Sequence, residues 1–143
     1  MIVEDELIIA NDLKLILSGL GYEISSVTAT AEEAINSVGQ NRPDLVLMDI
    51  VLKGEKDGIE TAEVIISRFD IPVVYLTAFS NQNVLDRAKK TRPHGYITKP
   101  VDRETLHSTI EVAISKHEAE KLIKESEEKY RLLYTSMNEG FSL

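Results

Sequence analysis

Short apolar runs alternate with longer amphipathic stretches along most of this chain. Three of these runs, 1–3, 45–48 and 73–76, lead directly into polar residues, and a weaker one spans 95–98. Apolar runs of about four residues, separated by segments of helical length, are typical of strands buried in a parallel sheet. A loosely alternating segment, 22–29, predicts one more strand.

The segments between these strands show helical spacing. Gly19 and Gly21 follow the first apolar stripe, as is typical of the end of a helix. Thr30 and Glu33 match a capping box, so a helix is expected from there to about Val38. The predicted helices are one whose apolar stripe runs over 9–20, one over 31–38, one over 58–69, one capped by Ser80 and one capped by Asp102. This alternation predicts an α/β fold, a parallel sheet with right-handed crossovers and helices on both faces.

Composition narrows the class of protein. The 143 residues suffice for one domain and a short appendage, and 43% hydrophobic with 28% charged residues is typical of a globular protein. No apolar run approaches the roughly 20 residues of a membrane helix, and the absence of cysteine fits a cytoplasmic protein. The net charge of −8 argues against a nucleic-acid partner.

The first strand and the C-terminal segment each have an unusual pattern. The first strand is short, which predicts that a few residues precede Met1 in the natural protein. Charges of both signs alternate over 115–131, as in a solvent-exposed or connecting helix. A new apolar stripe follows at Tyr130, Leu133, Tyr134 and Met137, and it lacks an evident partner within the chain.

Polar residues at the ends of the apolar runs suggest a common site. Ligands of open α/β sheets bind beyond the carboxyl ends of the strands, so Glu4, Asp5, Asp49, Thr77 and Lys99 are expected to meet there. Three crowded carboxylates need a compensating cation, and oxygen-only ligands suit Mg²⁺. A metal and an ammonium would let the carboxylate of Asp49 accept a phosphoryl group.

The same residues lie in motifs that occur in a known order. On these motifs the chain resembles the receiver domain of response regulators in two-component signalling, over residues 1–117. The resemblance implies a doubly wound, flavodoxin-like three-layer fold with sheet order 2-1-3-4-5. The motifs are Val3-Glu4-Asp5-Glu6, Met48-Asp49-Ile50, Asp57-Gly58, Leu76-Thr77-Ala78 and Gly95-Tyr96-Ile97-Thr98-Lys99-Pro100.

The resemblance also implies a role for each site residue. Asp49 is the acceptor that takes a phosphoryl group from a histidine kinase. Thr77 and Tyr96 are the switch residues, which change the shape of the surface formed by the fourth helix, fifth strand and fifth helix. Lys99 holds a phosphate oxygen, and its bond to Pro100 is cis. The implied Mg²⁺ ligands are Asp5, Asp49, the Val51 carbonyl and, through water, Glu4.

Two departures from the family pattern concern the loop and the acidic pair. The loop after Asp49 has Lys53 where many receivers carry proline and is one residue longer, with Gly54 available to turn it. The acidic pair is Glu4-Asp5 rather than two aspartates. Val51 and Phe79 are apolar and flank the site, which predicts limited access of water to an aspartyl phosphate.

Other functions are less well supported by the residues. Phosphatases of the haloacid dehalogenase type need a second acid two residues after the nucleophile, where this chain has Val51. A degenerate receiver that serves only as an interaction module stays open. His94, His107 and His117 lack the spacing of metal ligands and receive no role.

The C-terminal segment suggests a longer protein. Residues 126–141 resemble the opening of a PAS sensor domain, so 118–143 is interpreted as a helical linker and the truncated start of a PAS-like domain. Downstream PAS or kinase domains would then be partners in the same chain. The last helix is a candidate for pairing two chains into a homodimer, and no membrane partner is expected.

Overall fold

The computed structural model describes residues 1–52, 56–78 and 82–140, with side chains described as far as residue 133. Its centre is a five-stranded parallel sheet in the order β2-β1-β3-β4-β5. The predicted doubly wound order is therefore confirmed. The strands are β1 (Ile2–Val3), β2 (Val27–Thr28), β3 (Val46–Asp49), β4 (Val73–Thr77) and β5 (Gly95–Thr98).

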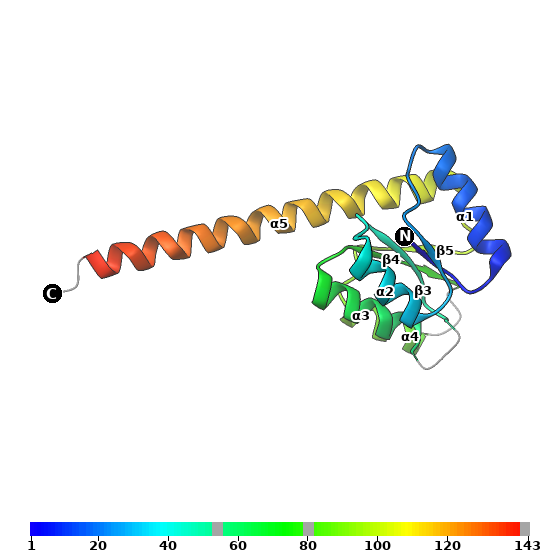
Figure 1. Ribbon diagram of the computed structural model, residues 1–143, viewed down its shortest axis with the longest axis horizontal. Coiled ribbons are helices and arrows are strands. Elements are labelled where there is room, and N and C mark those ends of the chain that lie inside the picture. Colours follow the sequence, from blue (N-terminus) through cyan, green and yellow to red (C-terminus); the bar gives the residue numbers. More distant parts are fainter. Residues whose placement is uncertain (53–55, 79–81, 141–143) are drawn as a thin grey trace.

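Helices cover both faces of this sheet (Figure 1). On one face α1 and α5 pack against the strands, and on the other face α2, α3 and α4 do so. Side chains of β4 alternate between the two layers, with Tyr75 buried toward α3 and α4 and Leu76 toward α1 and α5. The helices are α1 (Leu7–Gly19), α2 (Ala31–Gln40), α3 (Gly58–Phe69), α4 (Gln82–Lys90) and α5 (Arg103–Gly140).

Two of the predicted helix caps are confirmed by hydrogen bonds. The Thr30 hydroxyl accepts from the Glu33 backbone N–H at 3.2 Å, and the Asp102 carboxylate accepts from the Thr105 N–H at 2.8 Å. The predicted cap at Ser80 lies outside the described residues. Gly21, with φ at +92°, supplies the left-handed turn after α1.

Two predicted boundaries were wrong. The second strand covers only Val27–Thr28 rather than 22–29, because its sole neighbour β1 is itself two residues long and offers no further ladder. The helix α2 runs to Gln40 instead of ending near Val38, with Asn41 as its C-cap.

The helix α5 is 38 residues long and extends far beyond the sheet (Figure 1). Two histidines hold it where it leaves the domain: His94 bonds Glu120 at 3.0 Å, and His117 bonds Asp70 at 3.3 Å. From residue 118 to residue 133 every side chain is exposed. Within the described part of the chain, none of the helices combines the length and apolar character of a membrane span.

Candidate functional site

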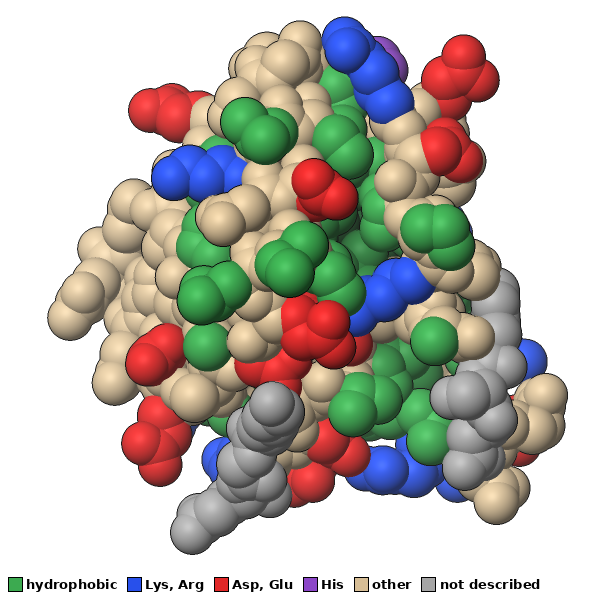
Figure 2. Space-filling view, turned by 90° about the vertical axis from the view of Figure 1, so that its right-hand side faces the viewer, with side chains coloured by type: hydrophobic (Ala, Val, Ile, Leu, Met, Phe, Trp, Pro, Cys, Tyr) green, Lys and Arg blue, Asp and Glu red, His purple; other side chains and the backbone are tan. Residues whose placement is uncertain are grey.

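The sheet brings the predicted polar residues together at one edge. Glu4 and Asp5 follow β1, Asp49 ends β3, Thr77 ends β4 and Lys99 follows β5. A cavity of about 330 Å³ opens there, and its lining includes all of these residues except Glu4. Figure 2 shows this end of the molecule, where acidic side chains gather beside a basic one among hydrophobic side chains.

Three carboxylates form a tight cluster in this site. One oxygen from each of Glu4, Asp5 and Asp49 lies within 4.8 Å of the others. Glu4 is 2% exposed and Asp49 5% exposed, while Asp5 is half-buried. Hard oxygen ligands at such spacing fit a divalent cation such as Mg²⁺, which binds through a few carboxylates and keeps several waters. The donor set is thus compatible with the metal expected from the sequence.

Lys99 supplies a positive charge to the same cluster. Its Nζ donates to Glu4 Oε2 at 3.2 Å and to Asp49 Oδ2 at 3.1 Å. Burial alone would lower the pKa of the ammonium, but the charges and hydrogen bonds of Asp49 and Glu4 outweigh burial and raise it. The lysine therefore stays charged and holds the two carboxylates side by side.

The surroundings of Glu4 change its protonation. Burial, together with the hydrogen bond and negative charge of Asp49, raises the pKa of Glu4 to about 7, against the opposing effect of Lys99. Its other oxygen, Oε1, accepts from the Glu6 backbone N–H at 3.2 Å. Near neutral pH this carboxyl group is therefore partly protonated when no metal compensates its charge.

The backbone around Asp49 fixes the direction of its carboxylate. The Val51 N–H donates to Asp49 Oδ1 at 3.1 Å, and the Gly58 N–H donates to the Ile50 carbonyl at 3.0 Å. A Cβ at position 58 would lie 1.8 Å from the carbonyl oxygen of Asp49. Glycine is thus required for α3 to begin directly against the backbone of the site.

The start of α3 is also linked to α4. Asp57 accepts from the Glu60 N–H at 2.9 Å with Oδ1, and from Arg87 at 3.1 Å with Oδ2. Sequence analysis missed Arg87, because an arginine on a charged helix face gives no signal of the residue it meets. Asp57 therefore connects the loop after the site to α4.

Thr77 and Tyr96 lie on the same face of the sheet. Thr77 is 6% exposed, and its carbonyl accepts from the Lys99 N–H at 2.8 Å. Tyr96 pairs with Tyr75 in the strand register, and their ring centroids are 6.0 Å apart. Because Thr77 pairs with Thr98, Tyr96 is its diagonal neighbour across the two strands. Partial burial raises the pKa of the Tyr96 hydroxyl.

The remaining expectations about the site concern the bond to Pro100 and the residues that flank the cavity. The Lys99–Pro100 peptide bond is cis, as expected. The expectations for Lys53, Gly54 and Phe79 fall on positions outside the described residues. Val51 is 71% exposed, so its side chain lies at the mouth of the cavity.

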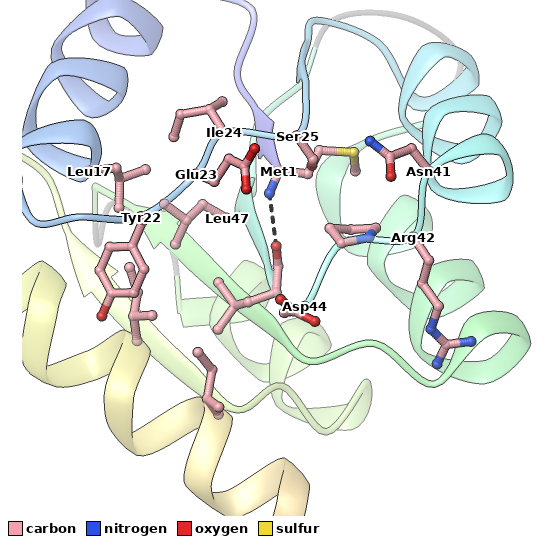
Figure 3. Close-up of a pocket in the computed structure, with 14 residues that line it drawn as sticks. Met1, Leu17, Tyr22, Glu23, Ile24, Ser25, Asn41, Arg42, Asp44 and Leu47 are labelled. Atoms are coloured by element: carbon pink, nitrogen blue, oxygen red, sulfur yellow. Dashed lines mark hydrogen bonds between the residues drawn. The ribbon is translucent and has the colours of Figure 1, made fainter.

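Another cavity, of about 350 Å³, lies at the opposite end of the sheet (Figure 3). Its walls come from the segments that precede β2 and β3 and from α1 and α5. The Met1 ammonium donates to the Leu45 carbonyl there at 2.9 Å. The carboxylate cluster and Lys99 are at the other edge, so the chemistry described above belongs to the 330 Å³ cavity.

Comparison with known proteins agrees with this geometry. Residues 1–111 match the family described as the response regulator receiver domain. The chain belongs to this family. The receiver fold and the family expected from the sequence are therefore confirmed.

Individual relatives show how far the likeness extends. The transcriptional regulatory protein PdtaR of Mycobacterium tuberculosis is 37% identical over 116 residues, covering 81% of this chain and 56% of PdtaR. The signal receiver domain of a modulated diguanylate cyclase from Desulfovibrio desulfuricans is 39% identical with a TM-score of 0.80, covering 83% of this chain and 94% of that one.

A third similar protein is the N-terminal domain of a response regulator/sensory box/GGDEF three-domain protein from Carboxydothermus hydrogenoformans. It is 34% identical with a TM-score of 0.76, and the match covers 83% of this chain and 95% of that one. The chain spans about half the length of the curated relatives it matches, such as PdtaR.

Proposed function

We propose that this receiver domain is a working phosphoacceptor, in which Asp49 takes a phosphoryl group from the phosphohistidine of a histidine kinase. The observation that carries the proposal is the Lys99 ammonium. It lies 3.1 Å from Asp49 and 3.2 Å from Glu4, beside a cavity open to a donor. A degenerate interaction module would have no need to keep three carboxylates and a lysine in this arrangement.

The metal of the proposed site is Mg²⁺. Asp5, Asp49 and the Val51 carbonyl are its proposed ligands, and Glu4 is proposed to act mainly through water. The bound ion would neutralise the carboxylates and stabilise charge on the oxygens of the phosphoryl group. The half-buried position of Asp5 and the depth of Glu4, 2% exposed, fit this division between direct and water-mediated contact.

The proposed transfer proceeds at the carboxylate of Asp49. One of its oxygens attacks phosphorus, and the phosphorus–nitrogen bond of the donor breaks with its electron pair left on the nitrogen. The donor ring, protonated at its other nitrogen, thereby leaves as the neutral imidazole of the kinase. Lys99 then holds an oxygen of the acyl phosphate as a compact cationic donor. Ala78 leaves space beside Thr77 for the incoming group, and it lines the cavity.

The proposed response begins at Thr77. The phosphoryl group adds roughly −1.5 to −2 charges and three acceptor oxygens, which the Thr77 hydroxyl can bond. An inward movement of Thr77 frees space for its diagonal neighbour Tyr96 on the same face. The surface of α4, β5 and α5 is then the proposed readout, with Arg87 and Asp57 linking α4 to the site.

The segment 118–143 is proposed to lead from the receiver, 1–117, into a PAS-like domain of a longer cytoplasmic protein, with further PAS or kinase domains downstream. A similar receiver precedes a sensory box in the Carboxydothermus protein. The uninterrupted α5 supports a connecting role, since it carries the chain well clear of the sheet. Homodimers through this helix are part of the proposal.

Intact-mass measurement after incubation with acetyl phosphate tests the acceptor, with and without Mg²⁺. We expect a Mg²⁺-dependent phosphoryl adduct on the parent chain and none on Asp49→Asn. Asp57→Asn is the matched control, since it changes the other aspartate of this loop while keeping an oxygen to cap α3. Its adduct should equal that of the parent.

Two results would contradict the proposal. An adduct retained by Asp49→Asn would place the acceptor elsewhere. No adduct from acetyl phosphate or from a panel of phosphorylated histidine kinases, together with no Mg²⁺ binding by calorimetry, would favour a degenerate module.

A further inference from the structure

The exposed part of α5 carries an apolar strip on one side. Ile123, Tyr130 and Leu133 are 60%, 71% and 57% exposed, and Ala119 and Ser126 are exposed as well. At about 3.6 residues per turn all five project from the same side of the helix. We call these five residues, together with Leu122, the outer stripe.

Charged residues avoid the outer stripe completely. Between 118 and 131 every residue outside the stripe is charged, and helical spacing places each of these residues on the remaining surface of the helix. They are Glu118, Glu120, Lys121, Lys124, Glu125, Glu127, Glu128, Lys129 and Arg131. A helix that only connected domains through water would be polar all round. This segregation indicates that the stripe is covered by another apolar surface.

The spacing of the stripe indicates what covers it. Ala119, Ile123, Ser126, Tyr130 and Leu133 follow one another at intervals of four and three residues. This repeat of seven with two inward positions is the seam of a coiled coil, in which helices of the same kind pair with each other. The sequence continues the interval of four at Met137. Toward the domain the same spacing passes through the exposed Lys116 and reaches Val112, which is 55% exposed.

The outer stripe faces away from the receiver domain to which it belongs. Leu106, Ile110 and Ala113 are the α5 residues buried against the sheet, and they lie about half a turn from Val112 and the stripe. His117, which bonds Asp70, is on the same inner side. A partner helix laid along the stripe would therefore lie on the opposite side of α5 from the sheet, even beside Val112.

We propose that two copies of this chain pair in parallel and in register through the outer stripe of α5. The two receiver domains then lie on the outer sides of the helix pair. Register is set by Ser126, the polar residue of the seam between Ala119 and Leu133, which meets its counterpart hydroxyl instead of an apolar layer. An antiparallel pair centred there would bring the two Glu127 side chains together, whereas the parallel pair places Glu127 beside Leu122 of the second copy.

Adjacent leucines provide a matched test. Leu133 is in the outer stripe, and Leu132, 71% exposed, projects from another side of the same turn. In sedimentation equilibrium over a concentration series, the parent chain should dimerise. Leu133→Glu should weaken the dimer by about tenfold or more, and Leu132→Glu should leave it unchanged. A monomeric parent, a trimer, or equal effects of both substitutions would overturn the proposal.

A single introduced cysteine tests the orientation, since the chain has no cysteine of its own. On mild oxidation Ala119→Cys should give a disulfide-linked dimer, because parallel copies bring position 119 to its counterpart. Lys121→Cys, two residues further along and on the charged surface of the helix, should not form a disulfide-linked dimer. Equal cross-linking of both variants, or of neither, would contradict parallel pairing in register.

This inference deepens the partner part of the proposed function, and the two can fail separately. The stripe lies outside the carboxylate site, so Leu133→Glu should still form the phosphoryl adduct of the parent. A chain that dimerises without accepting phosphate would refute the phosphoacceptor role alone, and a monomer that accepts phosphate would refute the pairing alone.

Discussion

Gly58→Ala places a methyl group where the structure has no space for one. The added Cβ would lie 1.8 Å from the Asp49 carbonyl oxygen and 2.9 Å from the Ile50 Cα. Both neighbours are backbone atoms, so a rotamer change of a side chain gives no relief. The first turn of α3 and the loop that follows Asp49 must separate instead.

The size of the effect follows from this separation. Cβ contacts below 3.0 Å are essentially never seen, so the closest contact must lengthen from 1.8 Å to at least that value. The helix that moves carries Ile59, Ala62 and Ile65, each at most 4% exposed. Overpacking of this kind costs about 1–3 kcal/mol in free energy of unfolding. For a domain of this size the expected fall in Tm is about 4–12 °C.

Thermal unfolding by circular dichroism measures this effect, and Gly39→Ala is the matched control. Gly39 is exposed within α2, and a Cβ there meets nothing within 4 Å. Replacing a helical glycine by alanine stabilises by up to about 1 kcal/mol, so this variant should melt up to about 4 °C higher. A Gly58→Ala Tm equal to that of the parent would refute the close approach between α3 and Asp49. The same variant should also form the phosphoryl adduct more slowly, since Asp49 moves with the loop.

Three further changes have defined outcomes. Asp102→Ala removes the cap of α5 and should lower the urea midpoint of unfolding, whereas Asp102→Asn keeps an acceptor oxygen and should match the parent; equal losses would contradict capping. Lys99→Met leaves two buried carboxylates without their cation and should destabilise the metal-free protein by roughly 2 kcal/mol at pH 8, with a larger rise in Tm on adding Mg²⁺ than the parent shows. Because the pKa of Glu4 is raised from 4.5 to about 7, its contribution to metal-free stability is present below 4.5 and is lost as pH rises through 7. Urea unfolding should therefore show stability falling between pH 5 and pH 7.5, by at most ~3 kcal/mol, and Glu4→Gln should abolish this slope.

The elements that were predictable from the sequence are those with strong local patterns. The apolar runs 45–48 and 73–76 became β3 and β4, which are buried on both faces and so require continuous hydrophobic residues. The positions of Asp49, Thr77 and Lys99 at one edge follow from the parallel order of these strands. The extent of β2 could not be read in this way, because the length of an edge strand depends on its partner β1.

Contacts between residues far apart in the chain could not be predicted from local sequence patterns. His94 and His117 show no motif, yet together they hold α5 where it leaves the domain. Arg87 is one of several basic residues of α4, and only the fold brings it to Asp57. The requirement for glycine at position 58 arises from the backbone of Asp49, nine positions earlier in the sequence. Such residues become recognisable only when the packing of the helices on the sheet is known.

The strand β5 joins the two functional regions of the molecule. Lys99 follows its carboxyl end and contacts Asp49, while His94 precedes its other end and bonds Glu120 on α5. Tyr96 lies between them, against Tyr75 of β4. The two contacts are joined by a strand of only four residues that is paired with β4 and packed against α5. A displacement of β5 in response to Asp49 would therefore act directly on the contact that sets the direction of α5, and so on the helix that we propose pairs two chains.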